Sequence, residues 1–380
     1  MSDPLLRFRA ELPVTGHCAY LNHAGTGPLS RRGAERMAAL ADTVSRTGDR
    51  VWSERQREVE RVRGMAARLL GAREAHEVAF VENTSTALSM VAQGLDWQAG
   101  DNVVGAALEF PSNVYPWMQL ADKGVEYRRA EERDGRIDPG ELLSLIDERT
   151  RMLALSWVQY ASGFRSDLAL LGRACRERGV LFVVDVIQGL GALPLDVERD
   201  LVDVAAASSH KWLLGVEGLG LLYVSDRVVE QLRPARSGWR SMRDTFKWTD
   251  YSLSWNDGAK RFESGTLNAY GIVALGGSLE ILLEAGAEAL ERRVLALADR
   301  AARGLADLGF SLVSSRAPGE TSGIVAATHP RLNPSELVRR LDGKDIVLAA
   351  RVGRLRFSSH FYNTEEEIDR ALAALQEAGG

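Results

Sequence analysis

The chain has 380 residues, of which 45% are hydrophobic and 26% are charged, and its formal net charge is -5. These values are ordinary for a soluble globular protein, and they exclude the basic stripe of a nucleic-acid-binding protein and the polybasic segment of a membrane-surface protein. No run approaches the roughly 20 apolar residues of a membrane-spanning helix, so we expect small-molecule partners, neither nucleic acid nor membrane as a partner, and a cytoplasmic location.

Short β-rich runs alternate with helical patterns from about residue 77 to residue 224. The predicted strands cover residues 78–81, 103–104, 125–127, 152–155, 181–184, 202–204 and 219–224. Between them, residues 168–179 show helical periodicity and end on a glycine. This alternation predicts a mostly parallel sheet with helices on both faces.

The pattern changes after Ser237. Residues 239–262 are aromatic and irregular, and we interpret them as loops near a site or an interface. Further along the chain, the pattern predicts helices over 270–308, a strand at 323–327, a helix at 334–340 and strands at 346–349 and 355–357. The last helix begins at Thr364, whose capping box is completed by Glu367. We therefore predict a large domain at 20–255 and a small α+β domain formed by 1–19 and 256–380.

Three polar features follow apolar strands, where ligands of open parallel sheets bind. Asp185 directly follows the run 181–184, although it could equally be a turn cap. The hydroxyl-rich stretch 82–92 opens a helix and can bind phosphate, although an ordinary helix cap is the simpler interpretation. Lys211 follows the apolar run 202–207 after two serines and a histidine. It could be an imine-forming nucleophilic amine, or a lysine at a strand end whose charged group extends to solvent. Together, these features match the needs of pyridoxal phosphate: a Schiff-base lysine, an acidic partner for the pyridine nitrogen and a phosphate anchor.

Four segments resemble the class V aminotransferase and cysteine desulfurase superfamily of fold type I pyridoxal-phosphate enzymes. The lysine signature is Asp-Val-Ala-Ala-Ala-Ser-Ser-His-Lys at 203–211, followed by Gly-Leu-Gly at 218–220. The other three are Tyr-Leu-Asn-His-Ala-Gly at 20–25, Arg-Phe-Glu-Ser-Gly-Thr-Leu-Asn at 261–268 and the stretch 354–364. The resemblance implies an α/β fold with a mostly parallel seven-stranded sheet in the large domain and a smaller C-terminal α+β domain.

The resemblance also implies a role for each matching residue. Lys211 would carry the cofactor, Asp185 would pair with the pyridinium nitrogen and Gln188 would bond the ring hydroxyl. The phosphate would be held by Ser85, Thr86, Ser208 and His210, and by Gly265 and Thr266 from the neighbouring subunit of an obligate homodimer with its active sites at the interface. Phe110 would stack on the ring, and the substrate side would be formed by Arg356 at the α-carboxylate together with Gln159, Tyr160, Asn22 and His23.

The chain departs from the cysteine desulfurases in two places. Those enzymes carry a persulfide-forming cysteine shortly before the carboxylate arginine, whereas residues 346–356 contain no cysteine. They also place a histidine over the cofactor ring, where this chain has Phe110, which cannot carry a proton. Cys18 and Cys175, the two cysteines of the chain, show no metal-binding spacing, and we expect both to be reduced and no metal to be bound. The chain therefore resembles the subgroup without the persulfide cysteine, which includes C–S lyases and isopenicillin N epimerase-like proteins.

We expect an enzyme that acts on an α-amino acid through an external aldimine and an α-carbanion, with a preference for β-elimination of the C–S lyase type. The alternatives are transamination and epimerisation; an epimerase would need a second acid, for which His23 and His360 are candidates. An NAD-dependent Rossmann oxidoreductase shares the alternating pattern, but no GxGxxG follows a first strand. A non-catalytic, cofactor-binding regulator would need a DNA-binding module, for which the chain has neither the length nor the charge.

Overall fold

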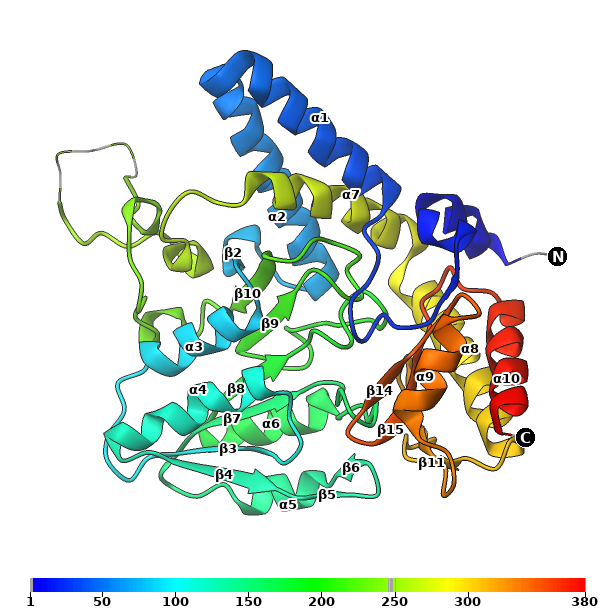
Figure 1. The fold of residues 1–380 in the computed structure, drawn as a ribbon. Coiled ribbons are helices and arrows are strands. Elements are labelled where there is room, and N and C mark those ends of the chain that lie inside the picture. The colour runs from blue at the N-terminus through cyan, green and yellow to red at the C-terminus, as the bar shows by residue number, and fades with distance from the viewer. Residues whose placement is uncertain (1–2, 245, 247–248, 250, 380) are drawn as a thin grey trace.

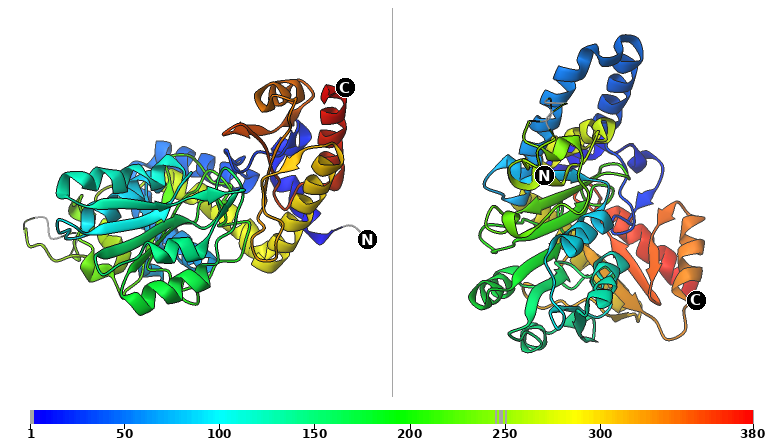
Figure 2. Two further views of the ribbon diagram at one scale, coloured as in Figure 1. Left: turned by 90° about the horizontal axis from the view of Figure 1, so that it is seen from below. Right: turned by 90° about the vertical axis from the view of Figure 1, so that its left-hand side faces the viewer.

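A computed structural model describes residues 3–244, 246, 249 and 251–379. Part of the predicted aromatic region, residues 245, 247–248 and 250, lies outside this description. The large part of the molecule is built on one sheet with helices on both sides, and the C-terminal part packs beside it (Figure 1, Figure 2). The predicted fold class is confirmed.

The central sheet has seven strands in the order β2-β10-β9-β8-β7-β3-β4. In chain order they are β2 (Val78–Val81), β3 (Asn102–Ala106), β4 (Glu126–Ala130), β7 (Thr150–Ser156), β8 (Leu181–Asp185), β9 (Val204–Ser208) and β10 (Gly220–Val224). β10 runs antiparallel to both of its neighbours, β2 and β9, and the other neighbouring pairs of this sheet are parallel. β9 begins where the predicted strand 202–204 ends, because Val202 and Asp203 form the connection into it.

Both faces of the sheet are buried, as expected for continuous apolar strands of a parallel sheet. Leu153 and Leu155 pack into the core formed with helices α2 (Trp52–Leu70), α6 (Leu168–Arg178) and α7 (Ala269–Ala285). Met152 and Ala154 point to the other side, into the core formed with α3 (Thr84–Gly94) and α4 (Tyr115–Met118). Two short elements, α5 (Pro139–Ser144) and the hairpin β5 (Glu132–Arg133) with β6 (Arg136–Ile137), lie near the β4 edge.

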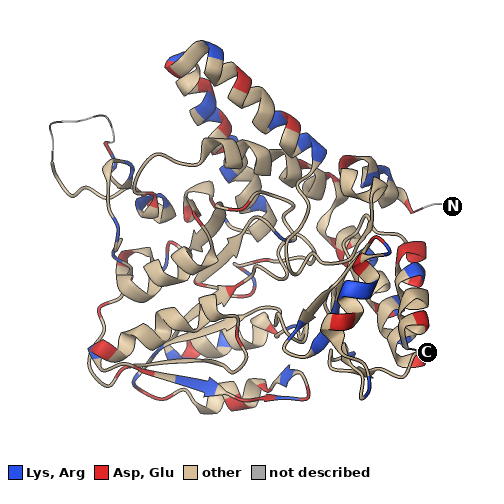
Figure 3. Ribbon diagram, viewed as in Figure 1, with Lys and Arg blue, Asp and Glu red and all other residues tan. Residues whose placement is uncertain are grey.

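α1 (Arg31–Thr47) and α2 form a helical hairpin that projects from the large part, with α7 packed against both (Figure 1). Acidic and basic residues are interspersed along both helices of this hairpin (Figure 3). Ile272, Leu275 and Leu279 of α7 belong to the core of the large sheet, although the predicted boundary at residue 256 assigns α7 to the small domain. That boundary stays a prediction.

The small part contains a four-stranded antiparallel sheet in the order β11-β12-β15-β14. Its strands are β11 (Ser311–Leu312), β12 (Ile324–Thr328), β14 (Ala349–Arg351) and β15 (Arg354–Ser358). It packs with α8 (Ala287–Asp307), α9 (Pro334–Asp342) and α10 (Glu365–Gly379) around one apolar cluster. N-terminal β1 (Ala19–Tyr20) joins this part by pairing in parallel with β13 (Ile346–Val347).

No single helix within the described ranges is long and apolar enough to cross a membrane. The α7 and α8 segments meet that criterion only as a pair, and they are bent by 86° where they join.

A buried ion pair joins α2 to the segment that precedes α7. Arg63 and Glu263 are both buried, and Arg63 Nη1 donates to Glu263 Oε1 at 2.6 Å and to the carbonyl of Val78 at 2.7 Å. The same Glu263 oxygen accepts the backbone N–H of Phe80 at 2.9 Å. These bonds connect α2, β2 and the loop before Gly265.

Substitution Arg63→Ala would leave the buried Glu263 carboxylate with only the Arg240 guanidinium, 3.7 Å away, as a cationic partner. Removing one partner of a buried pair costs about 3–5 kcal/mol, so we expect the free energy of unfolding, measured by urea titration, to fall by that amount. Arg57→Ala, at an exposed site of the same helix, is the matched control and should change it by less than about 0.5 kcal/mol. Equal effects of the two substitutions would contradict this account.

Candidate functional site

A cavity of about 290 Å³ opens at the carboxyl ends of β8 and β9, beside the first turn of α3. This is where open parallel sheets bind their ligands. Many of the predicted site residues line it: Ser85, Phe110, Tyr160, Asp185, Gln188, Ser208, His210, Lys211 and Arg356. The remaining predicted residues, described below, do not line it.

Lys211 and Asp185 enter this cavity from neighbouring strands. Asp185 is the last residue of β8, and Lys211 lies three residues beyond the end of β9. Both are buried. Burial lowers the pKa of the Lys211 amine, while the charge of Asp185 opposes that shift. Burial also raises the pKa of the Asp185 carboxyl, and the Ile187 N–H, which donates to its Oδ1 at 3.0 Å, opposes this. The site thus holds an amine that loses its proton readily, close to a carboxyl group.

The backbone around Lys211 is held by a close approach of Gly27. The Gly27 N–H donates to the carbonyl of His210 at 2.7 Å. A Cβ atom at position 27 would lie 2.1 Å from the carbonyl oxygen of Lys211. Only glycine fits this contact, so residues 20–27 help to fix the lysine.

The α3 end of the cavity has the character of an anion site. The hydroxyl groups of Thr84 and Ser208 lie 3.1 Å apart, and the Thr84 N–H donates to Ser208 Oγ at 2.9 Å. Ser85 Oγ and Ser112 Oγ are 2.6 Å apart. Hydroxyl groups at a helix N-terminus suit a phosphate. Thr86 does not line the cavity: its N–H donates to Asn83 Oδ1, the cap of α3.

Phe110 presents an exposed ring to the cavity, and Lys211 Nζ lies 5.4 Å from the ring centroid. The ring of Tyr160 meets Phe110 edge to face at 5.4 Å. The Phe110 ring is therefore free to cover a planar ligand next to the amine.

Arg356, in β15, closes the side of the cavity opposite the large sheet. It is 1% exposed, and Nη1 donates to the carbonyl of Tyr160 at 2.8 Å. Its Nε and Nη2 atoms are buried and have no hydrogen-bond partner among the residues that the structure describes. Burial, together with the charge of nearby Arg351, lowers the pKa of Arg356 to about 10. Buried guanidinium nitrogens without partners are ready to bind a carboxylate.

The side-chain amides of Gln159 and Gln188 both form hydrogen bonds within the protein. Gln159 Nε2 donates to Glu109 Oε1 at 2.8 Å, which places Gln159 outside the cavity lining. Gln188 does line the cavity; its Nε2 donates to the Ala24 carbonyl, and its Oε1 accepts the indole N–H of Trp212. One amide hydrogen of Gln188 has no assigned partner and can serve a ring oxygen.

The rings of His23 and His360 both contact the ring of Trp212, and neither histidine lines the cavity. The ring nitrogens of His23 lie 2.9 Å from the Ser358 carbonyl and 2.7 Å from the Tyr362 hydroxyl. Burial lowers the pKa of His23 well below its usual value and that of His360 to about 4. Both are neutral core histidines, and Asn22 next to them does not line the cavity either.

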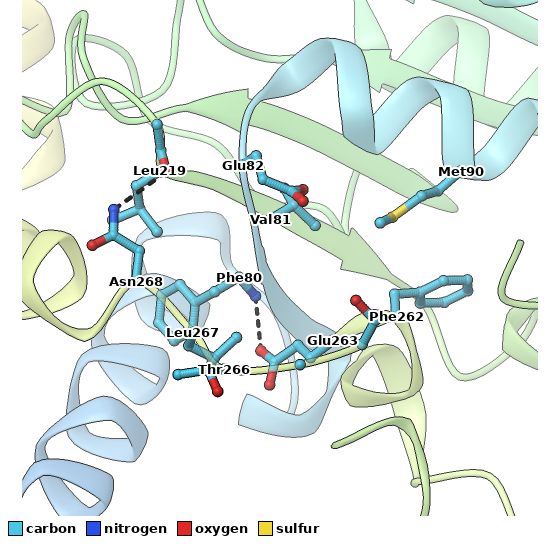
Figure 4. Close-up of a pocket in the computed structure, with 13 residues that line it drawn as sticks. Phe80, Val81, Glu82, Met90, Leu219, Phe262, Glu263, Thr266, Leu267 and Asn268 are labelled. Carbon is cyan, nitrogen blue, oxygen red and sulfur yellow. Dashed lines mark hydrogen bonds between the residues drawn. The ribbon is translucent and has the colours of Figure 1, made fainter. Parts of the chain in front are cut away.

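Gly265 and Thr266 line a different, smaller cavity of about 90 Å³, between β2, α3 and the loop before α7 (Figure 4). In this view the Glu263 carboxylate bonds the Phe80 N–H. The two residues therefore do not contribute to the Lys211 cavity of their own chain.

Sequence reasoning missed four contributors. Thr84 and Ser112 join the anion end, and Arg351 lines the cavity beside Arg356. Glu109 is buried and accepts the Ser156 N–H at 2.7 Å, and burial raises its pKa. The one feature of the sequence that could have indicated Glu109 as a site residue was its position next to Phe110.

The profile of the family described as Aminotransferase class-V matches residues 19–371. This chain belongs to that family. A probable cysteine desulfurase of Methanothermobacter thermautotrophicus is 29% identical, with 98% of this chain and 97% of the relative covered. The structure of an apo cysteine desulfurase from Thermococcus onnurineus NA1 is similar, with a TM-score of 0.91, 26% identity and coverage of 100% and 98%.

A third relative is C-DES, named as a cystine C–S lyase. Its structure with glycine covalently linked to the pyridoxal-phosphate cofactor has a TM-score of 0.91, 26% identity and coverage of 97% and 99%. The class-V chain described here is a pyridoxal-phosphate-dependent enzyme. Its own residues fit that cofactor: an amine at Lys211, a carboxyl at Asp185, an exposed ring at Phe110 and hydroxyl groups at the α3 N-terminus.

We expect pyridoxal phosphate to attach covalently to Lys211, a step that requires the neutral amine. The pH midpoint for the rate of attachment to the apoprotein, fixed with borohydride and quantified by mass spectrometry, should lie below the ordinary lysine pKa of about 10.4. The attachment rate rises with pH through that midpoint. Because the charge of Asp185 raises the pKa of Lys211, Asp185→Asn should move the midpoint lower. A midpoint that stays in place or moves higher in that variant would contradict the assigned coupling.

Proposed function

We propose that this enzyme cleaves a carbon–sulfur bond of a small α-amino acid by β-elimination, without a persulfide on a cysteine. The observation that carries the proposal is the composition of the cavity. Its lining includes the Lys211 amine and the Arg356 guanidinium, and neither of the two cysteines of the chain.

Both thiols are poorly suited to sulfur transfer. Cys175 is buried in α6, and burial raises its pKa to about 12. Cys18 precedes β1, and burial and the nearby Asp345 and Glu367 raise its pKa. A reactive cysteine needs a lowered pKa and access to the substrate. The segment 346–356, which the resemblance matches to the cysteine-bearing segment of the desulfurases, contains no cysteine, and the β14–β15 turn within it consists of Val352 and Gly353.

The chain's own residues can perform the proton steps of this elimination. When bound, pyridoxal phosphate supplies an electron sink for the substrate α-carbon. Arg356 orients the α-carboxylate, and the Lys211 amine accepts the α-proton. The electron pair of the broken C–H bond forms the Cα–Cβ double bond, and the C–S electrons leave with sulfur. Water converts the resulting enamine to pyruvate and ammonia. A thiolate is a good leaving group, because the thiol pKa is only about 8.5. The departure of sulfur therefore needs no acid at position 110, where Phe110 cannot donate a proton.

Transamination is the second candidate, because it needs the same lysine and no further acid. Epimerisation has weaker support, because it requires an acid on the opposite face of the substrate α-carbon. The two candidates, His23 and His360, are neutral and form hydrogen bonds to the backbone carbonyls of Ser358 and Trp212.

The test is a product assay with cysteine, cystine and S-substituted cysteines. We expect sulfide, persulfide or thiol to appear together with equimolar pyruvate, with no need for a keto acid. The double variant Cys18→Ser/Cys175→Ala should keep the rate within about twofold, because neither thiol touches the site. Loss of sulfur release in that variant would contradict the proposal, and keto-acid-dependent exchange alone would favour transamination.

We further propose a homodimer in which Gly265 and Thr266 reach the cofactor phosphate of the other subunit. Both residues line another cavity and are absent from the lining of the chain's own Lys211 cavity, which supports this arrangement. Mixing subunits that carry Lys211→Ala with subunits that carry Thr266→Asp should restore activity that neither parent shows, since each mixed dimer has one intact site. No restoration after confirmed subunit exchange would contradict it.

A further inference from the structure

The β14–β15 hairpin carries three arginines on one face. Arg351 is paired with Arg354 across the strands, and Ala349 is paired with Arg356. Directly opposite residues of an antiparallel pair share a face, as do residues two apart on a strand. Arg351, Arg354 and Arg356 therefore point to the same side, toward the large part of the molecule.

The three arginines differ in what neutralises them. Arg354 Nη2 pairs with the Glu132 carboxylate at 3.0 Å. Arg356 contacts a carbonyl group, and Arg351 Nη1 donates to the carbonyl of its neighbour Ala350 at 2.8 Å. Within the described part of the chain, no carboxylate forms an ion pair with Arg351 or Arg356. Both line the Lys211 cavity.

The charges lining the cavity are thus unbalanced. Lys211, Arg351 and Arg356 contribute cations, and Asp185 is the only carboxylate among the described lining residues. The anion end at α3 lies on the large sheet, whereas Arg351 lies on the hairpin, next to the arginine assigned to the α-carboxylate. The spare cation is therefore on the substrate side.

We propose that Arg351 binds a second anionic group on the side chain of the substrate, so that the enzyme prefers amino acids with an acidic side chain. Carboxylate, sulfinate and sulfonate groups share this chemistry. The inference rests on the proposed function only in needing an amino-acid substrate. Arg351 lies one strand repeat, about 7 Å along the hairpin, from Ala349, the residue that faces Arg356, and both arginines line the same cavity. The positive charge of Arg351 also acts on Arg356 and Lys211, lowering the pKa of each, which places it within electrostatic reach of the reacting centre.

The test compares acids with their amides on the holoenzyme: aspartate with asparagine, glutamate with glutamine, and S-carboxymethylcysteine with its amide. Amino-acid-induced changes in cofactor absorbance give dissociation constants whatever reaction follows. We expect the acid of at least one pair to bind at least about tenfold tighter, as a charge-assisted contact implies. Arg351→Ala should reduce that acid-over-amide preference by about tenfold or more, to near equal binding of acid and amide, and Arg351→Lys should keep part of it.

Arg303→Ala is the matched control, because it removes the same charge from an exposed site on α8, and it should keep the preference. Equal binding of acids and amides by the wild-type enzyme would overturn the inference while leaving the proposed function intact. The inference would also be overturned if Arg351→Ala weakened the binding of the cofactor and of all amino acids equally. Arg351 would then bind the cofactor phosphate and not the substrate side chain. No absorbance response to any amino acid would overturn the proposed function and this inference together.

Discussion

The structure depends on keeping one primary amine out of water. Lys211 and Asp185 lie at the ends of adjacent strands of a sheet that is covered on both faces, so neither group has the solvation that its charge requires. Burial favours the neutral form of each, and their mutual attraction favours the charged forms. A lysine balanced in this way can change protonation state at modest cost. The same lysine at a solvated surface would remain an ammonium ion.

Several structural features maintain this balance. Gly27 fixes the backbone at the lysine through a contact that leaves no room for a side chain. The buried Arg63–Glu263 pair joins α2 to β2, the strand that leads into α3, and to the loop that carries Gly265. Glu109 adds a further buried carboxylate, whose charge raises the pKa of Asp185. Unpaired cations and hydroxyl groups around one cavity reduce stability in the free protein, and binding of the cofactor and substrate anions offsets that cost.

The sequence was sufficient to predict those site residues whose position follows from the order of the strands alone. Asp185 and Lys211 follow apolar runs that are consecutive in the sheet, and their meeting at one edge is a general property of parallel sheets. Thr84, one residue before the predicted Ser85, could not be distinguished from it, because a single position decides which hydroxyl faces the strand end. The position of the Glu109 side chain depends on the unusual backbone of Leu108, whose φ is 56°. The position of His23 depends on packing against residues more than 300 positions away in the chain. Such long-range contacts leave no local pattern.

The short turn between β14 and β15 links the reaction to its specificity. Val352 and Gly353 both have positive φ, at 50° and 71°, as a two-residue hairpin requires. So tight a turn has no room for the cysteine-bearing loop that the resemblance associates with desulfurases. It also fixes the register that puts Arg351 on the same face as Arg356. A longer loop would move the hairpin end, and with it the second guanidinium, away from a fixed position at the cavity. The same short turn therefore supports both proposals: it leaves no room for a cysteine-bearing loop, and it sets the position of Arg351 at the cavity.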